Sequence, residues 1–470
     1  MSSAALFQAV LDLLAVALLA LGIKGLSRIR SARAANQLAA SAMALAVVGL
    51  LVHAQPTAVT WVWIAGGAAV GGALGALTAR LVPMTAMPET VALFNGCGGL
   101  SSLLVALGVM WAAKGDGGVS PGLLVLVSIG FSIVVGAVTC TGSVVAMGKL
   151  QGWLATPGWM MSRWRHGFNI ALATVVLLAA VLTVGGSSDA LWPLIISASL
   201  LGVGLTLPVG GADMPVVISL LNSYSGVAAA AAGFVVGQRL LIVAGAMVGA
   251  AGLILTQVMC AGMNRSLTAV LFGGALGAAS TGSKESSEYT NITSCSAEEC
   301  ALTLEAAERV VVVPGYGLAV AQAQHTLREV ARLLEKHGVT VTYAIHPVAG
   351  RMPGHMNVLL AEADVPYEQL KEMDIINPEF PATDVVLVLG ANDVVNPQAK
   401  TDPDSPLYGM PVLDVQEART VFVVKRGMGA GYSGIKNDLF ERPNTSMLFG
   451  DAKQVLSTIL GELKVLGVGQ

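Results

Sequence analysis

The sequence predicts a polytopic α-helical membrane domain followed by a cytoplasmic α/β domain with a parallel sheet. Three observations support this prediction. The chain is 54% hydrophobic and only 12% charged, it contains a long series of apolar runs, and from residue 309 onward it alternates short strands with helical segments. Its charge is also divided unevenly. Residues 1–282 hold 11 Lys and Arg against 5 Asp and Glu, and residues 283–470 hold 15 against 24.

Apolar runs of roughly 17–25 residues are long enough for a helix to cross a bilayer. A tenth, shorter and glycine-rich run, Leu267–Ala279, is interpreted as a linker. The expected organisation is a transmembrane domain over 1–264, a linker over 265–308 and a soluble domain over 309–470. The nine expected spans are Leu6–Ile23, Leu38–Val52, Val59–Leu77, Val91–Ala113, Leu123–Met147, Phe168–Val184, Leu191–Leu207, Met214–Val236 and Leu240–Cys260.

The distribution of cations between the spans predicts their orientation. Nine spans place eight Lys and Arg in loops on one side and only Lys114 and Arg239 on the other. Because cytoplasmic loops carry the excess of cations, the N-terminus is expected outside and the C-terminal domain in the cytoplasm. The first span lacks a basic leader and is interpreted as retained. The eight cations are Lys24, Arg28, Arg30, Arg33, Arg80, Lys149, Arg163 and Arg165.

The soluble part alternates two kinds of segment, which indicates a parallel sheet with helices on both faces, a Rossmann-like arrangement. Helical stretches are expected at Ala319–Lys336, His355–Ala363 and Ala452–Leu466. Strands are expected at Val310–Val313, Thr340–Ile345, Val385–Leu389, Val412–Val415, Val421–Val424 and Ser446–Phe449.

A glycine motif follows the first strand directly and predicts a nucleotide site. The motif consists of Gly315, Tyr316, Gly317, Leu318, Ala319 and Val320. Glycines at this place let the backbone approach a pyrophosphate, and the N-terminus of the following helix, expected at Ala321–Lys336, offers N–H groups and a positive dipole. A Gly-x-Gly pair alone is weak evidence, but its position between strand and helix favours nucleotide binding.

Two features favour NADP over NAD. The second strand ends in Ala344–Pro347 without the acidic residue that holds an NAD ribose. The strand Val421–Val424 runs into Lys425 and Arg426, two cations suited to a 2′-phosphate. The alternative interpretation of this pair is a solvated basic loop.

Three further loops are expected at the same sheet edge, where such folds bind ligands. Each of the first two could instead be only a turn. One contains Gly350, Arg351, Met352, Pro353 and Gly354, the second contains Gly390, Ala391, Asn392 and Asp393, and the third spans Gly427–Tyr432 and includes Gly431 and Tyr432. The five cysteines lack the spacing of a metal site, and none is expected.

Polar residues recur at similar depth in three spans. Asp213 precedes the eighth span, and Asn222 lies roughly 12 Å into it at the helical rise. Glu89 and Asn95 repeat this arrangement on the fourth span, and Ser143 lies at a comparable depth in the fifth. Polar groups in a membrane usually face the bundle interior or water, so these five are candidates for a proton path. Interhelical hydrogen bonding is the alternative, especially for Asn95 and Ser143.

Long motifs across the chain resemble the beta subunit of bacterial proton-translocating NAD(P) transhydrogenase. The resemblance extends over essentially the whole length. Its motifs are Gly210–Val217, Leu221–Gly226, Pro314–Gln322, His346–Asn357, Gly390–Asp393 and Lys425-Arg426.

This resemblance implies that NADP(H) binds to the C-terminal domain while a separate alpha subunit binds NAD(H), with direct hydride transfer between the two nicotinamides. Lys425 and Arg426 would hold the 2′-phosphate, Gly315–Val320 and Arg351 would line the phosphates, and Asp393 would lie near the nicotinamide half. Asp213 and Asn222 would belong to the proton path. A homodimer of alpha–beta units in the bacterial inner membrane is expected, mainly making NADPH, with no nucleic-acid partner.

One position departs from the family pattern. Many family members carry a membrane histidine where this chain has Asn95. Because asparagine does not exchange a proton near neutral pH as imidazole does, the carrier is expected either in the partner's membrane segment or in water ordered by Asn95 and Asn222.

Two other function classes are alternatives. An ion transporter gated by a regulatory nucleotide-binding domain would usually carry the acidic residue after the second strand, which is absent here. A quinone-linked membrane dehydrogenase subunit would need flavin, haem or iron–sulfur ligation, and the cysteine pattern provides none.

Overall fold

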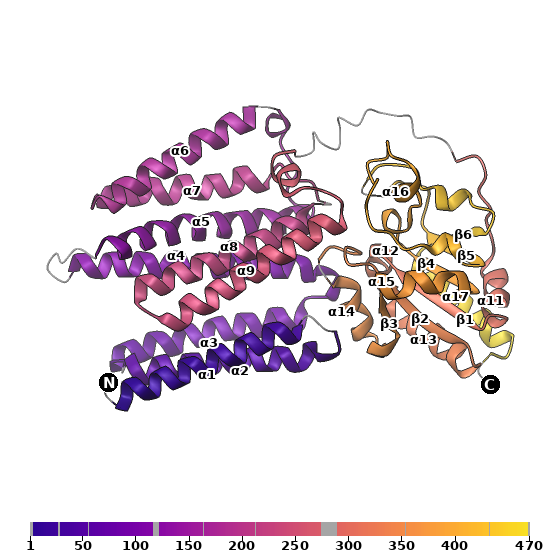
Figure 1. The fold of residues 1–470 in the computed structure, drawn as a ribbon, viewed down its shortest axis with the longest axis horizontal. Helices are drawn as coiled ribbons and strands as arrows, with labels where there is room; N and C mark the ends of the chain where they lie inside the picture. The colour runs from indigo at the N-terminus through magenta and orange to yellow at the C-terminus, as the bar shows by residue number, and fades with distance from the viewer. Residues whose placement is uncertain are drawn as a thin grey trace. The chain divides into compact units, whose positions relative to one another are not determined.

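The computed structural model describes residues 3–26, 29–54, 56–115, 122–162, 164–211, 213–273, 289–352, 354–431 and 433–468. The chain divides into two compact units, Met1–Thr256 and Gln257–Gln470, and each is described by itself. The first unit is helical, and the second contains the sheet (Figure 1).

Nine α-helices occupy the nine expected apolar runs. Eight of the helices among the described residues are long and apolar enough to span a bilayer, and α7, with 16 residues, is the shorter one. This confirms a polytopic membrane part. The helices are α1 (Ser3–Leu26), α2 (Ile29–Ala54), α3 (Ala58–Leu81), α4 (Met87–Gly115), α5 (Leu123–Leu150), α6 (Trp164–Val184), α7 (Leu191–Thr206), α8 (Met214–Val236) and α9 (Arg239–Gly262).

Glycines set how closely these helices pack. A Cβ added to Gly99 of α4 would lie 2.8 Å from the carbonyl oxygen of Gly136 on α5, and one added to Gly252 of α9 would lie 2.7 Å from the backbone nitrogen of Ser223 on α8. Such contacts with backbone exclude any side chain. Ser223 Oγ then donates a 2.7 Å hydrogen bond to the Gly249 carbonyl. Small residues with interhelical hydrogen bonds are the usual packing mode in a membrane.

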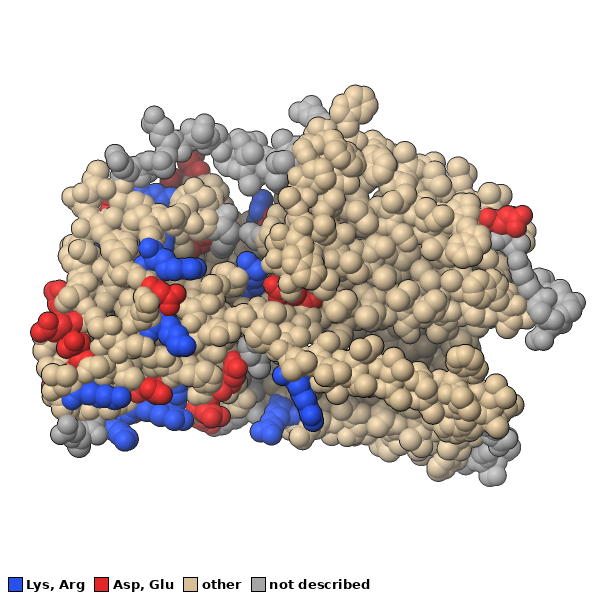
Figure 2. Space-filling view, turned by 180° about the vertical axis from the view of Figure 1, so that it is seen from behind, with Lys and Arg blue, Asp and Glu red and all other residues tan. Residues whose placement is uncertain are grey.

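Apolar side chains point outward as well as inward in this unit. In α3 no residue is buried against the rest of the chain, and Trp63 is 77% exposed. The face seen in Figure 2 carries almost no charge over the helical unit, whereas Lys, Arg, Asp and Glu gather over the sheet-containing unit. An uncharged, outward-facing apolar surface matches a lipid environment.

The second unit contains one six-stranded sheet in which every neighbouring pair is parallel. The strand order is β3-β2-β1-β4-β5-β6, which is the doubly wound order with its topological switch between β1 and β4. The strands are β1 (Arg309–Pro314), β2 (Thr340–Ile345), β3 (Leu370–Glu372), β4 (Val385–Leu389), β5 (Thr420–Lys425) and β6 (Thr445–Phe449).

Helices are interleaved with the strands along the chain. The apolar positions of α13 recur at helical spacing, at Leu327, Val330, Ala331 and Leu334, and all four are buried. The helices are α11 (Ala297–Glu305), α12 (Tyr316–Val320), α13 (Gln324–Lys336), α14 (His355–Glu362), α15 (Met373–Ile376), α16 (Gln398–Thr401) and α17 (Ala452–Val465).

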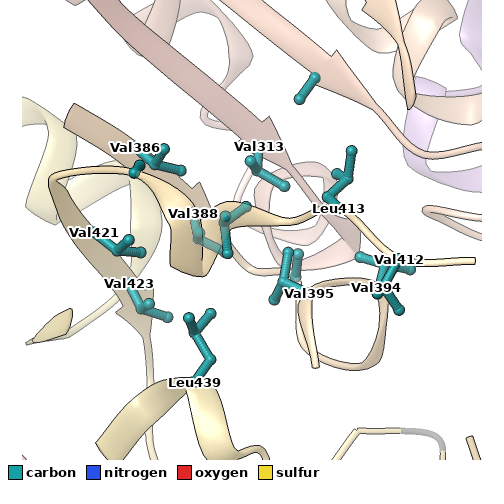
Figure 3. Close-up of a cluster of buried hydrophobic side chains, with 14 of the residues drawn as sticks. Val313, Val386, Val388, Val394, Val395, Val412, Leu413, Val421, Val423 and Leu439 are labelled. Carbon is teal, nitrogen blue, oxygen red and sulfur yellow. The ribbon is translucent and has the colours of Figure 1, made fainter. Parts of the chain in front are cut away.

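Alternate valines of the central strands form a core on one face of the sheet. Val313, Val386 and Val388 lie in this cluster with Leu413 and Leu439 (Figure 3). Side chains alternate between the two faces of a strand, and every residue of β4 is buried, so both faces of the sheet are covered at its centre. Short helical turns connect the elements, at Met84–Ala86, Gly158–Met161, Ser188–Ala190, Ala269–Gly273, Tyr367–Gln369, Asn377–Ala382, Asp393–Val395, Val415–Glu417 and Asp438–Glu441.

Two secondary-structure expectations are wrong. The helix expected over Ala319–Lys336 is two helices, α12 and α13, because the chain turns between them with Gln322 at a φ of 48°. The strand expected at Val412–Val415 pairs with no strand of the described sheet, and its backbone groups bond instead to loops, such as Leu413 N–H to the Val394 carbonyl at 2.9 Å. The third strand is β3, whose three residues show no apolar run.

The segment expected as a linker is described only in part, because residues 274–288 lie outside the described ranges. Residues 293–295 pair with the sheet: Met447 N–H donates to the Thr293 carbonyl at 2.8 Å, and Cys295 N–H donates to the Met447 carbonyl at 3.0 Å. Helix α11 packs on α17. The chain from residue 289 therefore belongs structurally to the sheet-containing unit.

Candidate functional site

Four loops leave the sheet at one edge. They follow β1, β2, β4 and β5, and because the strands are parallel their carboxyl ends lie on the same side. The loops after β1 and β4 flank the topological switch, the position where open parallel sheets bind ligands. The sequence placed all four glycine-rich segments at this edge, and the strand order supports that arrangement.

The loops after β1 and β4 touch each other backbone to backbone. Gly317 N–H donates to the Gly390 carbonyl at 3.0 Å, and a Cβ on Gly317 would lie 2.7 Å from the Cα of Gly390. A Cβ on Gly315 would overlap the backbone of Gly390 and Ala391. Gly390 itself has a φ of 66°, which favours glycine. The glycines thus allow the two loops to contact each other. From the sequence, they were expected only to allow the backbone to approach a pyrophosphate.

The N–H groups after β1 are not all available to a ligand, because Gly317 N–H is already bonded. Helix α12, which follows Gly315, has only five residues. Its Leu318 and Ala319 are fully buried and pack into the interior, while Val320 is 41% exposed. Of the predicted motif, Gly315, Tyr316 and Gly317 are therefore the residues placed at the sheet edge.

The loop after β2 brings a cation to the loop after β1. The Arg351 guanidinium carbon lies 4.4 Å from the centre of the Tyr316 ring, a cation–π contact. Arg351 N–H donates to His355 Nδ1 at 3.1 Å, so this nitrogen carries no proton. Gly350 has a φ of 107°, and its missing Cβ leaves room for that imidazole. Burial, with Arg351 nearby, lowers the pKa of His355, which keeps it a neutral acceptor.

His346, directly after β2, locks a neighbouring loop. Its Nε2 lies 2.8 Å from the Pro411 carbonyl, and Val348 N–H donates to Nδ1 at 3.3 Å. The carbonyl partner assigns the proton to Nε2. Burial lowers the pKa of His346 to about 4. The hydrogen bond to Pro411 acts in the opposite direction, but its effect is smaller. His346 is therefore neutral at physiological pH.

The loops after β4 and β5 meet at Asp393. This carboxylate is 2% exposed and accepts from Ser433 N–H at 3.0 Å and from Ser433 Oγ at 2.8 Å. A Cβ on Gly431 would overlap the same carboxylate. Asp393 was predicted as a site residue, and Ser433 was not, because no local signal links residues forty positions apart.

The cation pair after β5 separates into two environments. Lys425 is half-buried: its Nζ donates to the Gly429 carbonyl at 2.9 Å and lies 4.6 Å from the Phe440 ring centre. Burial lowers the pKa of Lys425, and the Asp393 carboxylate opposes that shift. Arg426 is exposed to solvent. Two cations of different burial at one strand end could each contact an anionic group.

The remaining predicted residues of these loops differ in burial. Met352 and Gly354 are partly exposed in the loop before α14, Ala391 is buried, and Asn392 is half-buried. Pro353 and Tyr432 lie outside the described residues. The structure thus places the phosphate-contacting candidates at the edge and several of their neighbours in the core.

Asn437 is a residue that sequence reasoning missed. It is fully buried, and its Nδ2 donates to the Asn392 carbonyl at 3.0 Å and to the Asn392 side-chain oxygen at 3.1 Å. Its Oδ1 accepts from Leu439 N–H at 2.9 Å and so caps a short helical turn. The only signal in the sequence is that asparagine often caps a helical turn, and this does not predict the hydrogen bonds to Asn392.

In the helical unit, two predicted residues are in contact. Asn95 Nδ2 on α4 donates to Ser143 Oγ on α5 at 3.1 Å. A Cβ added to Gly98 on α4 would lie 2.7 Å from the side chain of Ser225 on α8. One added to Gly142 on α5 would lie 3.2 Å from the side chain of Leu221 on α8. The stretch of α8 that includes Asn222 therefore packs against α4 and α5.

The two predicted acids of this unit are both buried. Glu89, in the first turn of α4, and Asp213, immediately before α8, are each 6% exposed. The loop before Asp213 is tied to α5 because Lys149 Nζ donates to the carbonyls of Leu207 and Val209, at 2.7 and 2.5 Å. From the sequence, Lys149 was expected only to be a loop cation.

The helical unit and the loop edge together define a class: a polytopic membrane protein that carries a doubly wound domain of the dinucleotide-binding type. The sequence profile described as NAD(P) transhydrogenase beta subunit matches residues 8–462. The chain is also 48% identical over 448 residues to the NAD(P) transhydrogenase subunit beta of Rhodospirillum rubrum, covering 94% of this chain and 95% of that protein, and equally to the sequence from a named strain of the same species. The chain belongs to the NAD(P) transhydrogenase beta subunit family.

Proposed function

We propose that this chain is the subunit of a proton-translocating transhydrogenase that binds NADP(H) and exchanges hydride with NAD(H) held by an alpha subunit. The proposal depends on one observation. The Gly315–Gly390 contact, Arg351 and Lys425 all belong to loops at the same edge of the sheet, and the same chain contains a bundle of membrane helices. Membership of the family supports this assignment.

The residues at this edge suit a phosphorylated dinucleotide. Lys425 and Arg426 would hold a 2′-phosphate, and Arg351 would approach the phosphates, because guanidinium and ammonium groups form charge-assisted hydrogen bonds with such oxygens. Gly315 would permit close backbone approach. Asp393 would hold the loop after β5 through Ser433. When bound, the dinucleotide supplies a nicotinamide that accepts or donates hydride, and this chain contributes its position and the exclusion of water.

The membrane residues would provide the coupling. Asn95, Ser143 and Asn222 lie on three mutually packed helices, and Asp213 and Glu89 are buried acids at the ends of two of them. Neither an amide nor a hydroxyl exchanges protons near neutral pH, so Asn95 and Ser143 would order water or a partner's protonatable group. Asp213 would link the proton path to the sheet-containing unit.

The direction of the reaction follows from the energy available. NAD and NADP couples are nearly equal in potential, so hydride exchange alone has little driving force. One proton crossing a membrane potential provides roughly 2.3 kcal/mol per 100 mV. That energy would favour NADPH formation if proton movement alternates with opening and closing of the NADP(H) site.

Three finer features belong to the same proposal. The excess of cations predicts an external N-terminus and a cytoplasmic sheet-containing unit. The location would be a bacterial inner membrane, and a homodimer of alpha–beta units would be the assembled form. The domain boundaries at 264 and 308 also remain predictions.

A vesicle assay tests the function. Vesicles containing this chain and the alpha subunit are incubated with NADH and an oxidised NADP analogue, and analogue reduction is followed by absorbance. Reduction that accelerates when the membrane is energised is the expected result. Ion flux without reduction would instead support the alternative, a transporter gated by its nucleotide domain, which no observation in the structure favours.

A further inference from the structure

Tyr289 connects two of the loops that form the proposed NADP(H) site, although it lies in neither. It is the first described residue after position 288, and it belongs to the sheet-containing unit. Its hydroxyl oxygen accepts a hydrogen bond from Asn437 N–H at 3.1 Å. Its ring lies 6.0 Å from that of Phe440, centre to centre, with 32° between the planes.

Each of these contacts leads to one nucleotide loop. Asn437 donates from its side chain to both oxygens of Asn392, the residue before Asp393. Phe440 receives Lys425 Nζ on its ring at 4.6 Å. Tyr289 thus contacts Asn437 and Phe440 directly. Through them it is connected to the loop after β4 and to the half-buried Lys425 after β5.

The segment around Tyr289 is fixed by an ionic anchor. Glu441 Oε1 accepts from Thr290 N–H at 2.7 Å, and Glu441 Oε2 lies 2.6 Å from Lys436 Nζ. The Lys436 hydrogen bond, with contacts to the backbone of Thr290 and Asn291, lowers the pKa of Glu441, so the anchor is a carboxylate. Lys436 Nζ also lies 5.1 Å from the Tyr289 ring centre.

The anchor and the site loops share one short stretch. Residues 436–441 carry Lys436, Asn437, Phe440 and Glu441, and the Lys436 carbonyl accepts from Asn396 Nδ2 at 3.1 Å. This stretch therefore touches Tyr289–Asn291 on one side and the loops after β4 and β5 on the other. A displacement of Tyr289 must be accommodated by the residues that hold Asn392 and Lys425.

We propose that Tyr289 is a positioning residue for NADP(H), which holds the loops after β4 and β5 in place through its contacts with Asn437 and Phe440. The inference rests on the proposed function, since it assigns a further residue to that same site. Tyr289 would act through these two loops and not by contact with the dinucleotide.

The test uses the assembled alpha–beta complex in vesicles. Tyr289→Phe removes the hydroxyl and keeps the ring, Tyr289→Leu removes both, and Tyr367→Leu, at a partly exposed tyrosine near β3, is the matched control. The measured quantities are the KM for NADPH, the KM for NADH and kcat in both reaction directions. Thermal melting of each complex reports folding.

The expected result is a graded rise in the KM for NADPH. Tyr289→Phe raises it by roughly two- to tenfold, the range of a single hydrogen bond, and Tyr289→Leu raises it further. The KM for NADH stays at the wild-type value. If Tyr289 had only a structural role, its variants would instead lower the melting temperature of the complex and the kcat in both reaction directions. The KM for NADPH would then not change differently from the KM for NADH.

Two outcomes separate this inference from the proposed function. An active wild-type complex, with the KM for NADPH unchanged in Tyr289→Phe and Tyr289→Leu, overturns the inference and leaves the function intact. A wild-type complex that reduces no NADP analogue overturns the function itself. If Tyr289→Leu fails to assemble, the Tyr289→Phe values decide.

Discussion

Asn95 Nδ2 donates a 3.1 Å hydrogen bond to Ser143 Oγ, joining α4 to α5 between residues 48 positions apart. Both were singled out from sequence as polar groups at similar depth, and interhelical hydrogen bonding was the stated alternative to a role in proton movement. The contact establishes the bond between them. It leaves the functional role as a proposal, because such a pair can both join helices and order water.

A double-mutant cycle on this pair measures the bond. Asn95→Ala and Ser143→Ala each remove one partner, so their effects on unfolding should not add. We expect a coupling free energy of about 0.6–2 kcal/mol, the range for side-chain hydrogen bonds between membrane helices. Unfolding in SDS with helicity as readout provides the values. Strictly additive effects would show that the bond contributes nothing to stability.

Asp213→Asn should impair proton-coupled turnover while NADP(H) binding stays normal. The acid is buried beside α8, far along the chain from the nucleotide loops, and the amide is nearly the same size but cannot ionise. Asp189→Asn, an exposed acid of the same unit, is the control. Proton uptake by vesicles and NADPH fluorescence titration are measured together. Normal pumping by Asp213→Asn would return this residue to a structural role.

Lys425→Ala with Arg426→Ala should abolish the preference for NADPH over NADH. Each cation would form a charge-assisted bond to a 2′-phosphate, so NADPH affinity should fall by roughly 10- to 100-fold for each cation lost, with little change for NADH. Lys453→Ala, on the first turn of α17, is the control. Fluorescence titration of the complex with each nucleotide gives the comparison, and unchanged discrimination would remove both residues from the site.

Gly315→Ala should weaken NADP(H) binding. Any Cβ there overlaps the backbone of Gly390 and Ala391, and backbone does not move aside as a flexible side chain does. The two loops must separate, at a cost of about 1–3 kcal/mol, which corresponds to a loss of affinity of roughly 5- to 150-fold. Gly461→Ala, on α17 with open space around it, should bind as the wild type does. Equal affinity in both variants would show that the loop contact is dispensable.

His346 should make the sheet-containing unit sensitive to acid. Its pKa falls from 6.5 to about 4 on folding because burial disfavours the charged form. The folded state therefore holds this proton less tightly than the unfolded chain. The contribution, roughly 3 kcal/mol, is fully present above pH 6.5 and is lost as the pH falls toward about 4.

Hydrogen exchange checks this acid sensitivity. Peptides covering β2 and residues 409–413 should lose protection over that pH range, after correction for intrinsic exchange. His346→Gln keeps a donor for the Pro411 carbonyl and does not titrate, so its protection should depend less on pH. Identical profiles for the two proteins would place the acid-sensitive group elsewhere.

The accuracy of the sequence predictions varied with how local the signal was. The nine apolar runs and the strands β1, β2 and β4 were predicted closely, since hydrophobic runs report burial directly. Val412–Val415 looked like a strand because its residues are apolar, yet Val412 and Leu413 are buried as a loop in the core. The edge strand β3 was missed because three residues with one buried side chain give no pattern.

For the site, the sequence identified the residue types and the edge, and the tertiary structure decided their partners. Glycines, cations and Asp393 could be recognised because turn geometry and phosphate chemistry restrict which residues serve. The contacts of Asp393 with Ser433, of Asn437 with Asn392 and of Tyr289 with Phe440 join residues 40, 45 and 151 positions apart. Such pairs are set by the order of the strands, and no local pattern in a chain specifies which distant loops that order brings together.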